Sequence, residues 1–298
     1  MQATGKGAPA NARYNLLITL DHNYIAPAKV MLSSLLFHNP GREIALYILH
    51  SSLTGEDLSE IQAVFDCSSR SENSRIFSIP IQDELLAGAP VTDRYPREMY
   101  YRIFAARYLP QELDRVLYLD PDLIVNGPLD ALYQTPMGDN LYAAASHVKE
   151  PMRKINAIRL GMESNGPYIN SGVLLIHLTR LRIEQDYRQV FQYVEKHKNH
   201  LLLPDQDVLS GLYSARILPL DPYRYNMTER LFVLRPESDA WLDLDWVRQN
   251  SAIIHYCGRN KPWKENYLGK LDVFYTQAAQ QLAEALAAFQ ATPPAVQK

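Results

Sequence analysis

The sequence predicts an α/β fold in which a mostly parallel sheet is flanked by helices. Short runs of Val, Leu, Ile and Tyr recur along the chain, and segments with apolar residues at helical spacing separate them. Strands that alternate with helices indicate parallel pairing, because parallel neighbours need a long crossover connection. The length of 298 residues and the 47% hydrophobic content allow one large domain or two modest ones.

The elements follow from local patterns. Pro27 suits a first helical turn, and Thr54 with Asp57 resembles a capping box at a helix start. The segments expected up to the middle of the chain are a strand at 14–20, a helix at 26–37, a strand at 44–49, a helix from about 55 to 65, a strand at 75–79, a helix at 97–108 and a strand ending at Asp120. Later segments are strands at 142–145, 173–176 and 253–256, helices at 182–197, 206–213 and 272–289, and an aperiodic, aromatic stretch at 221–250 that we interpret as a binding flap.

Bulk properties exclude several classes of protein. A formal net charge of −3 gives no general attraction to nucleic acid or to anionic lipid. Cys67 and Cys257 show neither metal-binding nor disulfide spacing, which fits a reducing compartment. Residues 1–13 lack the apolar core of a signal peptide and are expected to form a loose tail. With no membrane-length apolar stretch, we expect a cytoplasmic protein whose helix at 272–289 docks on the core.

Two carboxylates interrupt an apolar run at Asp120-Pro121-Asp122. Carboxylates next to a buried strand are costly unless they are paired or bind a cation. Pro121 lacks a backbone donor and holds Asp120 extended, so the strand should end there and direct both acids at the crevice beyond the sheet. Two hard oxygen donors suit Mg²⁺ or Mn²⁺ that also carries a substrate phosphate.

The pattern Asp-x-Asp is weak by itself, since the chain also contains it at Asp205/Asp207 and Asp243/Asp245. Only the pair at Asp120 follows a buried strand. The alternative for that pair is a strand-end turn with solvated acids, and the pair at Asp243 looks like a solvated edge.

A second informative segment is the strand-like run that delivers His255, followed by Gly258, Lys261 and Trp263. A neutral imidazole can complete a metal site begun by two carboxylates, and a lysine can hold a phosphate. Taken singly, His255 fits a core histidine better than a ligand, and Lys261 fits a solvated lysine better than a phosphate contact. Together, and after an acid pair, they favour a metal and phosphate site.

Two further segments are ambiguous by themselves. In Asp21-His22-Asn23-Tyr24 the tyrosine can stack on a base, while Asp and Asn can bond one edge of uracil, yet the same residues make ordinary turns. Asp205 and Gln206 can bind sugar hydroxyls, yet acids are also usual at a helix start.

Six segments in this order resemble glycosyltransferase family 8. They are Leu20-Asp21-His22-Asn23-Tyr24, Tyr101-Arg102, Tyr118-Leu119-Asp120-Pro121-Asp122, Asn170-Ser171-Gly172, Asp205-Gln206-Asp207 and the run from His255 to Trp263. Within the family, the sequence is most similar to bacterial lipopolysaccharide galactosyl- and glucosyltransferases, and glycogenin is a more distant relative.

The resemblance implies a GT-A fold, a UDP-hexose donor, Mn²⁺ or Mg²⁺, a carbohydrate acceptor and transfer with retention of anomeric configuration. It implies a catalytic domain at 14–270, with a nucleotide-binding part at about 14–125 and an acceptor and sugar part at about 126–270, before a C-terminal helix and tail at 271–298. Carried over residue by residue, it implies metal ligands Asp120, Asp122 and His255, uridine contacts Asp21, Asn23 and Tyr24, diphosphate contacts Gly258 and Lys261, and donor-sugar contacts Arg102, Asn170, Asp205 and Gln206.

Retention usually calls for a carboxylate near the reacting carbon, as in retaining glycosidases. The matching position here is Gln206, a poor nucleophile. A front-face attack, in which the departing phosphate helps to deprotonate the acceptor, is therefore at least as well supported as a covalent intermediate. Asp207 is the alternative, less well placed nucleophile.

Two features of the sequence depart from the family pattern, and two other functions are compatible with part of the site. His22 stands where close relatives often have a second Asp, and the C-terminus lacks their basic, aromatic tail, which argues against membrane attachment. Residues 146–168 carry four cations that could meet an acidic glycan or simply be solvated. A sugar-nucleotide hydrolase or nucleotidyltransferase could use the same acids, and a non-catalytic sugar-nucleotide binding module would not need the whole set.

Overall fold

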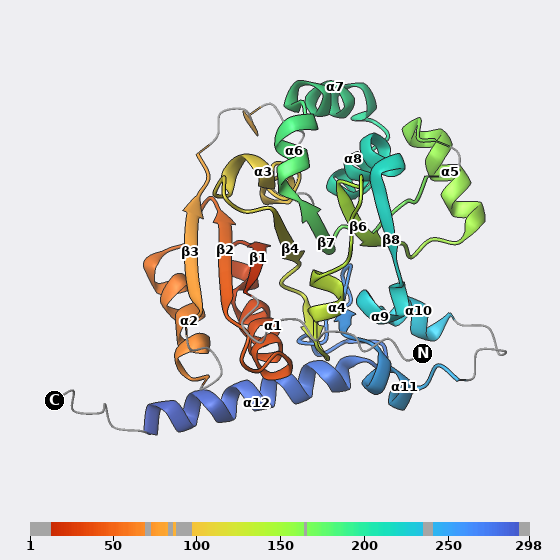
Figure 1. Cartoon of the computed structure of the whole chain (residues 1–298). Helices are drawn as coiled ribbons and strands as arrows, with labels where there is room; N and C mark the ends of the chain where they lie inside the picture. The colour runs from red at the N-terminus through yellow and green to blue at the C-terminus, as the bar shows by residue number, and fades with distance from the viewer. Residues whose placement is uncertain are drawn as a thin grey trace, which may run out of the picture.

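The computed structural model describes residues 13–68, 73–82, 86–87, 97–163, 166–234 and 241–291. Within them a seven-stranded sheet has the order β3-β2-β1-β4-β7-β6-β8 (Figure 1). Neighbouring strands are parallel except at β4–β7 and β7–β6, so the predicted mostly parallel α/β sheet is confirmed. In chain order its strands are β1 (Tyr14–Thr19), β2 (Ile44–His50), β3 (Arg75–Pro80), β4 (Arg115–Leu119), β6 (Tyr142–Ala145), β7 (Val173–His177) and β8 (Ile217–Leu220).

A second, two-stranded sheet pairs β5 (Leu123–Val125) with β9 (Ile253–His255) in antiparallel register. The chain leaves the large sheet after β4 and enters the small one at β5. Asp120, Pro121 and Asp122 make this transition, so the strand ends where the proline predicted. The pairing of Leu123 with His255 brings together segments 132 positions apart, since 255 minus 123 is 132.

Helices cover both faces of the large sheet. The α-helices are α1 (Ile25–His38), α2 (Gly55–Asp66), α3 (Ala105–Tyr108), α4 (Asp130–Tyr133), α5 (Glu150–Leu160), α6 (Leu178–Glu184), α7 (Tyr187–His197), α8 (Pro204–Tyr213), α9 (Pro222–Tyr225), α10 (Glu229–Val233), α11 (Leu244–Asn250) and α12 (Asp272–Ala291). Short 3-10 helices are η1 (His22–Tyr24), η3 (Arg97–Tyr100) and η4 (Ser214–Arg216).

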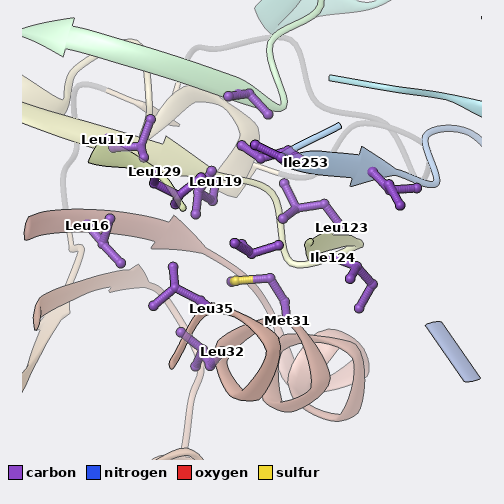
Figure 2. Close-up of a cluster of buried hydrophobic side chains, with 14 of the residues drawn as sticks. Leu16, Met31, Leu32, Leu35, Leu117, Leu119, Leu123, Ile124, Leu129 and Ile253 are labelled. Carbon is purple, nitrogen blue, oxygen red and sulfur yellow. The ribbon is translucent and has the colours of Figure 1, made fainter. Parts of the chain in front are cut away.

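Alternate strand residues serve two separate cores, because successive side chains of a strand point to opposite faces. Leu16 and Leu117 join the core that α1 covers, and Figure 2 shows them beside Leu32 and Leu35 of that helix. Leu17 belongs to the other core, together with residues of α6, α7 and α8. Burial on both faces explains why the strands read as continuous apolar runs.

Two predictions about individual helices are confirmed, the capping box of α2 and the docking of α12. The capping box is present, since the Asp57 amide donates to Thr54 Oγ1 and the Asp57 carboxylate accepts from the Thr54 amide. The first buried turns of α12 pack against α1, with Phe274 and Leu282 among the buried residues (Figure 1). This helix therefore docks on the core as expected. None of the helices in the described residues is long and apolar enough to cross a membrane.

Several elements differ from expectation. The helix expected at 97–108 is η3, a turn and α3, because residues 100 to 106 are all buried and a regular helix would turn one side to solvent. The helix expected at 182–197 is two helices, since Gln185 is extended and Asp186 caps α7. Elements α5 and β8 were not expected.

The stretch at 221–250 forms three short helices, α9 to α11, where a flap was expected. Asp221, Thr228 and Asp243 cap these helices, and Met227 pairs with Ile254 of β9. Residues 235–240 of this stretch, and the tails apart from Arg13, lie outside the described residues. The division of the catalytic domain at about residue 125 stays a prediction.

Candidate active site

Asp120, Asp122 and His255 converge at the ends of β4 and β9. One ligand atom of each lies within 4.8 Å of the others. His255 Nε2 is 3.2 Å from Asp122 Oδ1 and 3.7 Å from Asp120 Oδ2. Asp122 Oδ1 is buried and accepts no hydrogen bond from any described residue. Two carboxylates and an imidazole with a buried oxygen left unpartnered fit a divalent cation such as Mn²⁺.

Two backbone hydrogen bonds hold this cluster together. The Asp120 amide donates to the Gly172 carbonyl at 2.8 Å, where β4 meets the start of the antiparallel β7. The Tyr256 amide donates to the Asp122 carbonyl at 3.0 Å, where β9 meets β5. The acids are therefore held by the two sheets on either side of the transition.

Gly172 is required by space. A Cβ added there would lie 2.2 Å from His255 Cε1 and 2.6 Å from Asp120 Oδ2. Any side chain would therefore push the imidazole or the carboxylate out of the cluster.

Neighbouring side chains compensate the buried acids. Burial raises the pKa of Asp122, but His255 and Lys261 outweigh burial and hold that pKa well below its usual range. Lys261 Nζ donates to Asp122 Oδ2 and to the Tyr256 carbonyl, and although burial lowers the pKa of this ammonium, Asp122 raises it further. Burial raises the pKa of Asp120, and Arg102 only partly offsets this. The two carboxylates and Lys261 therefore form one network in which each charge affects the pKa of the others.

Arg102 connects the acid pair to the start of α8. Its Nη1 lies 2.9 Å from Asp120 Oδ1 and 3.1 Å from Asp205 Oδ2, and it donates to the Ser171 carbonyl. Ser171 Oγ donates to the same Asp205 oxygen at 2.7 Å, and Tyr118 donates to Asp120. Arg102 thus joins Asp120, which was expected as a metal ligand, to Asp205, which like Arg102 itself was expected at the donor sugar.

Gln206 and Asp207 differ in their surroundings. Asn170 Nδ2 is 3.4 Å from Gln206 Oε1, which links Gln206 to the segment before β7. The Asp207 side chain is fully buried, and Arg159, Tyr168 and two backbone amides donate to its oxygens. Both oxygens of the Asp207 carboxylate therefore have donors within the fold.

The segment expected to bind the nucleotide lies beside Lys261. Asp21 caps η1 by accepting from the Asn23 amide at 2.9 Å. The half-buried Tyr24 ring stands edge-on to Trp263 at 6.4 Å, and Lys261 Nζ is 5.9 Å from its centroid. His22 bonds Asp57 of α2 at 2.7 Å, so the departure at this position has its own partner in the fold. Gly258 has a positive φ of 85° and is exposed.

The cations of residues 146–168 lie on and around α5. Arg153 pairs with Glu150, and Arg159 pairs with Asp207. These two guanidinium groups are paired, and residues 150–160 of the segment form the helix α5.

Comparison with known proteins agrees with this fold. The sequence model of glycosyl transferase family 8 matches residues 15–267, and the chain belongs to this family. It is a glycosyltransferase with a GT-A fold. A lipopolysaccharide 1,2-glucosyltransferase of Escherichia coli is 28% identical over 257 residues, which are 85% of this chain and 74% of that protein. A lipopolysaccharide 1,3-galactosyltransferase of Salmonella typhimurium is 24% identical over 84% of this chain and 73% of its own length.

Among solved structures, the galactosyltransferase LgtC in complex with donor and acceptor sugar analogues is similar, with a TM-score of 0.72 and 25% identity. The match covers 94% of this chain and 98% of LgtC.

Among the residues that contact the predicted site residues, the sequence analysis gave no role to Tyr118, Ser171 and Asn226. Tyr118 and Ser171 stand inside the quoted motifs, so their position was a usable signal. Asn226 lies in the aperiodic stretch, and no pattern in the sequence singles it out. Its side chain lies 2.9 Å from His255 Nδ1.

Proposed function

We propose that this glycosyltransferase transfers glucose or galactose from a UDP-sugar to a hydroxyl of a glycan or related acceptor, with retention of configuration and with Mn²⁺ or Mg²⁺ at Asp120, Asp122 and His255. The observation that carries the proposal is the metal-ligating cluster at the transition between the two sheets. The relatives support the hexose, since their names give glucosyl and galactosyl transfer.

The arrangement of charges supports a nucleotide diphosphate as the donor group. Tyr24, Lys261 and Asp122 follow one another in space, as a base, a phosphate and a metal would. In this proposal Tyr24 stacks on uracil, Asp21 and Asn23 bond its edge, and Lys261 and the backbone at Gly258 meet the phosphates. A divalent cation held by the cluster would neutralise charge that develops on the leaving UDP.

We propose that Arg102, Asn170, Asp205 and Gln206 bind the donor sugar at the reacting side. Arg102 and Ser171 hold Asp205, so its carboxylate is oriented before substrate arrives. Because Asp207 is occupied by Arg159 and Tyr168, Gln206 is the favoured group near the reacting carbon. An amide is a poor nucleophile, which favours front-face attack. From an α-linked donor the product is then an α-glycoside, which anomeric proton coupling in NMR would identify.

The metal site is tested by removing a ligand. Asp122→Asn should abolish metal-dependent UDP binding and transfer, since an amide replaces an ionised ligand and Lys261 loses its counter-charge. His255→Leu is the second variant, because it removes the nitrogen ligand without changing the charge of the acid pair. Titration of Mn²⁺ by electron paramagnetic resonance and of UDP by calorimetry measures both effects, and circular dichroism verifies the fold.

Asp245→Asn is the matched control, since Asp245 occupies the same place in another Asp-x-Asp sequence and is exposed. It should bind Mn²⁺ and UDP like the unchanged protein. Full metal-dependent activity of both Asp122→Asn and His255→Leu would refute the site. Release of free hexose with no transfer to any hydroxyl acceptor would favour a hydrolase, and binding without turnover would favour a binding module.

A further inference from the structure

His255 lies between two different partners, and the position of its proton decides what it can do. Its Nε2 faces Asp122, while its Nδ1 is 2.9 Å from Asn226 Oδ1. A neutral imidazole has one protonated and one free nitrogen, and only the free nitrogen can ligate a metal. The ring therefore serves the cluster only if the proton sits on Nδ1.

A chain of hydrogen bonds that begins at a backbone amide determines which nitrogen of His255 carries the proton. The Gly172 amide can only donate, and it lies 3.1 Å from Asn170 Oδ1, which identifies that atom as the oxygen. The Asn226 atom 2.9 Å from the same oxygen must then be the amide nitrogen Nδ2. The other end of Asn226, which faces His255, is consequently an oxygen and needs a donor.

Burial leaves Asn226 no alternative partner in water. The residue is fully buried. Its backbone is held at both ends, since its amide donates to the Pro222 carbonyl and its carbonyl lies 2.8 Å from His147 Nε2. A buried amide that is bonded in this way has one orientation, because turning it over would place its oxygen against the Asn170 oxygen, where neither atom can donate.

We infer that Asn226 is a positioning residue that holds His255 as the Nδ1-protonated tautomer and so directs the free Nε2 at the metal site. Because Asn170 also donates to Gln206, the same chain of amides joins the metal ligand to the residues proposed for the donor sugar. The inference rests on the proposed metal site, but the tautomer can be measured without any metal.

The first test is NMR of ¹⁵N-histidine in the metal-free protein, at a pH high enough for the His255 ring to be neutral. His255→Leu identifies the signals of this ring. We expect a protonated Nδ1 and a free Nε2. A proton on Nε2 would overturn the inference whatever the protein binds, whereas failure of the unchanged protein to bind Mn²⁺ would refute the proposed function instead.

The second test compares three variants. Asn226→Leu removes the acceptor and should move the His255 proton toward Nε2 and weaken Mn²⁺ binding about 10- to 100-fold, the range for a lost partner of a ligating histidine. Asn226→Asp keeps an acceptor and should retain the Nδ1 proton. Asn39→Leu is the control, since Asn39 is also buried and its side chain bonds the backbone of Leu35 and Leu129. It should lower stability and leave the tautomer and Mn²⁺ affinity unchanged. An unchanged tautomer in folded Asn226→Leu would overturn the inference.

Discussion

Arg102, Lys261 and Asp205 are each bonded by several groups, so single side chains in this site are oriented before a ligand binds. Arg102 contacts two carboxylates and lies over the Tyr118 ring at 4.4 Å. Lys261 lies 5.5 Å from the Trp263 centroid as well as beside Asp122. A buried charge is tolerated only with such partners, and the same partners restrict its geometry.

At the residue scale, Tyr24 is expected to contribute base stacking. Tyr24→Ala should weaken UDP binding by about 1–3 kcal/mol, the range for a base stacked on an aromatic ring. Calorimetry with UDP, ADP and GDP measures this loss and the base preference. Tyr223→Ala is a control at another tyrosine, one whose ring packs edge-on against Trp241 and Trp246. Equal affinity of the unchanged protein for the three nucleotides would contradict uracil recognition.

Gln206 is expected to act on the reacting sugar and not on the diphosphate. Gln206→Ala should reduce kcat by about 10- to 1000-fold, the loss of one oriented polar group, while UDP-sugar affinity changes little. Rapid-quench kinetics and calorimetry separate the two effects. A trapped glycosyl adduct on Asp207 would overturn the front-face mechanism and keep the family assignment.

At the element scale, the site depends on the close approach of the ends of β4, β7 and β9. Gly172, just before β7, has no side chain and so leaves space for those of Asp120 and His255. Gly172→Ala should push the His255 ring away, lower the free energy of unfolding by about 1–3 kcal/mol as overpacking does, and weaken Mn²⁺ binding. Denaturant unfolding and Mn²⁺ titration measure both. Gly55→Ala is the control, since a Cβ there meets nothing within 4 Å. Normal metal affinity in Gly172→Ala would show that the close approach is not required.

Element prediction succeeded where a signal is contained within the element. The capping box at Thr54 and the continuous apolar runs of the strands are such signals. Prediction failed at 97–108 and at 182–197, where helical spacing continues but burial of Arg102 and capping by Asp186 break the helix. Tertiary contacts override helix propensity at those positions.

At the scale of the whole molecule, the last helix closes one face of the fold. Residues of α12 pack on β5 and on α1, which lies near the other end of the sequence (Figure 1). Leu282→Ala should lower the free energy of unfolding by about 2–5 kcal/mol, because it leaves a cavity in the core, with kcat unchanged in the folded protein. Gln280→Ala, on the exposed side of α12, should change it by less than about 0.5 kcal/mol. Equal stability of both variants would show that α12 is not part of the core.

The sequence by itself determined the fold class and the position of the acid pair. Apolar runs that alternate with segments of helical spacing, and a proline after a buried strand, are local properties. It also indicated His255 and Lys261 from the run around them, and Arg102 through its likeness to a family. The tertiary structure decided which of these side chains touch. Strand pairing sets His255 beside Asp122, and packing brings Asn226 against the other side of the His255 ring. Burial pairs Arg102 with Asp205 and Arg159 with Asp207. Such contacts depend on register and packing between segments far apart in the chain, and no local pattern contains that information.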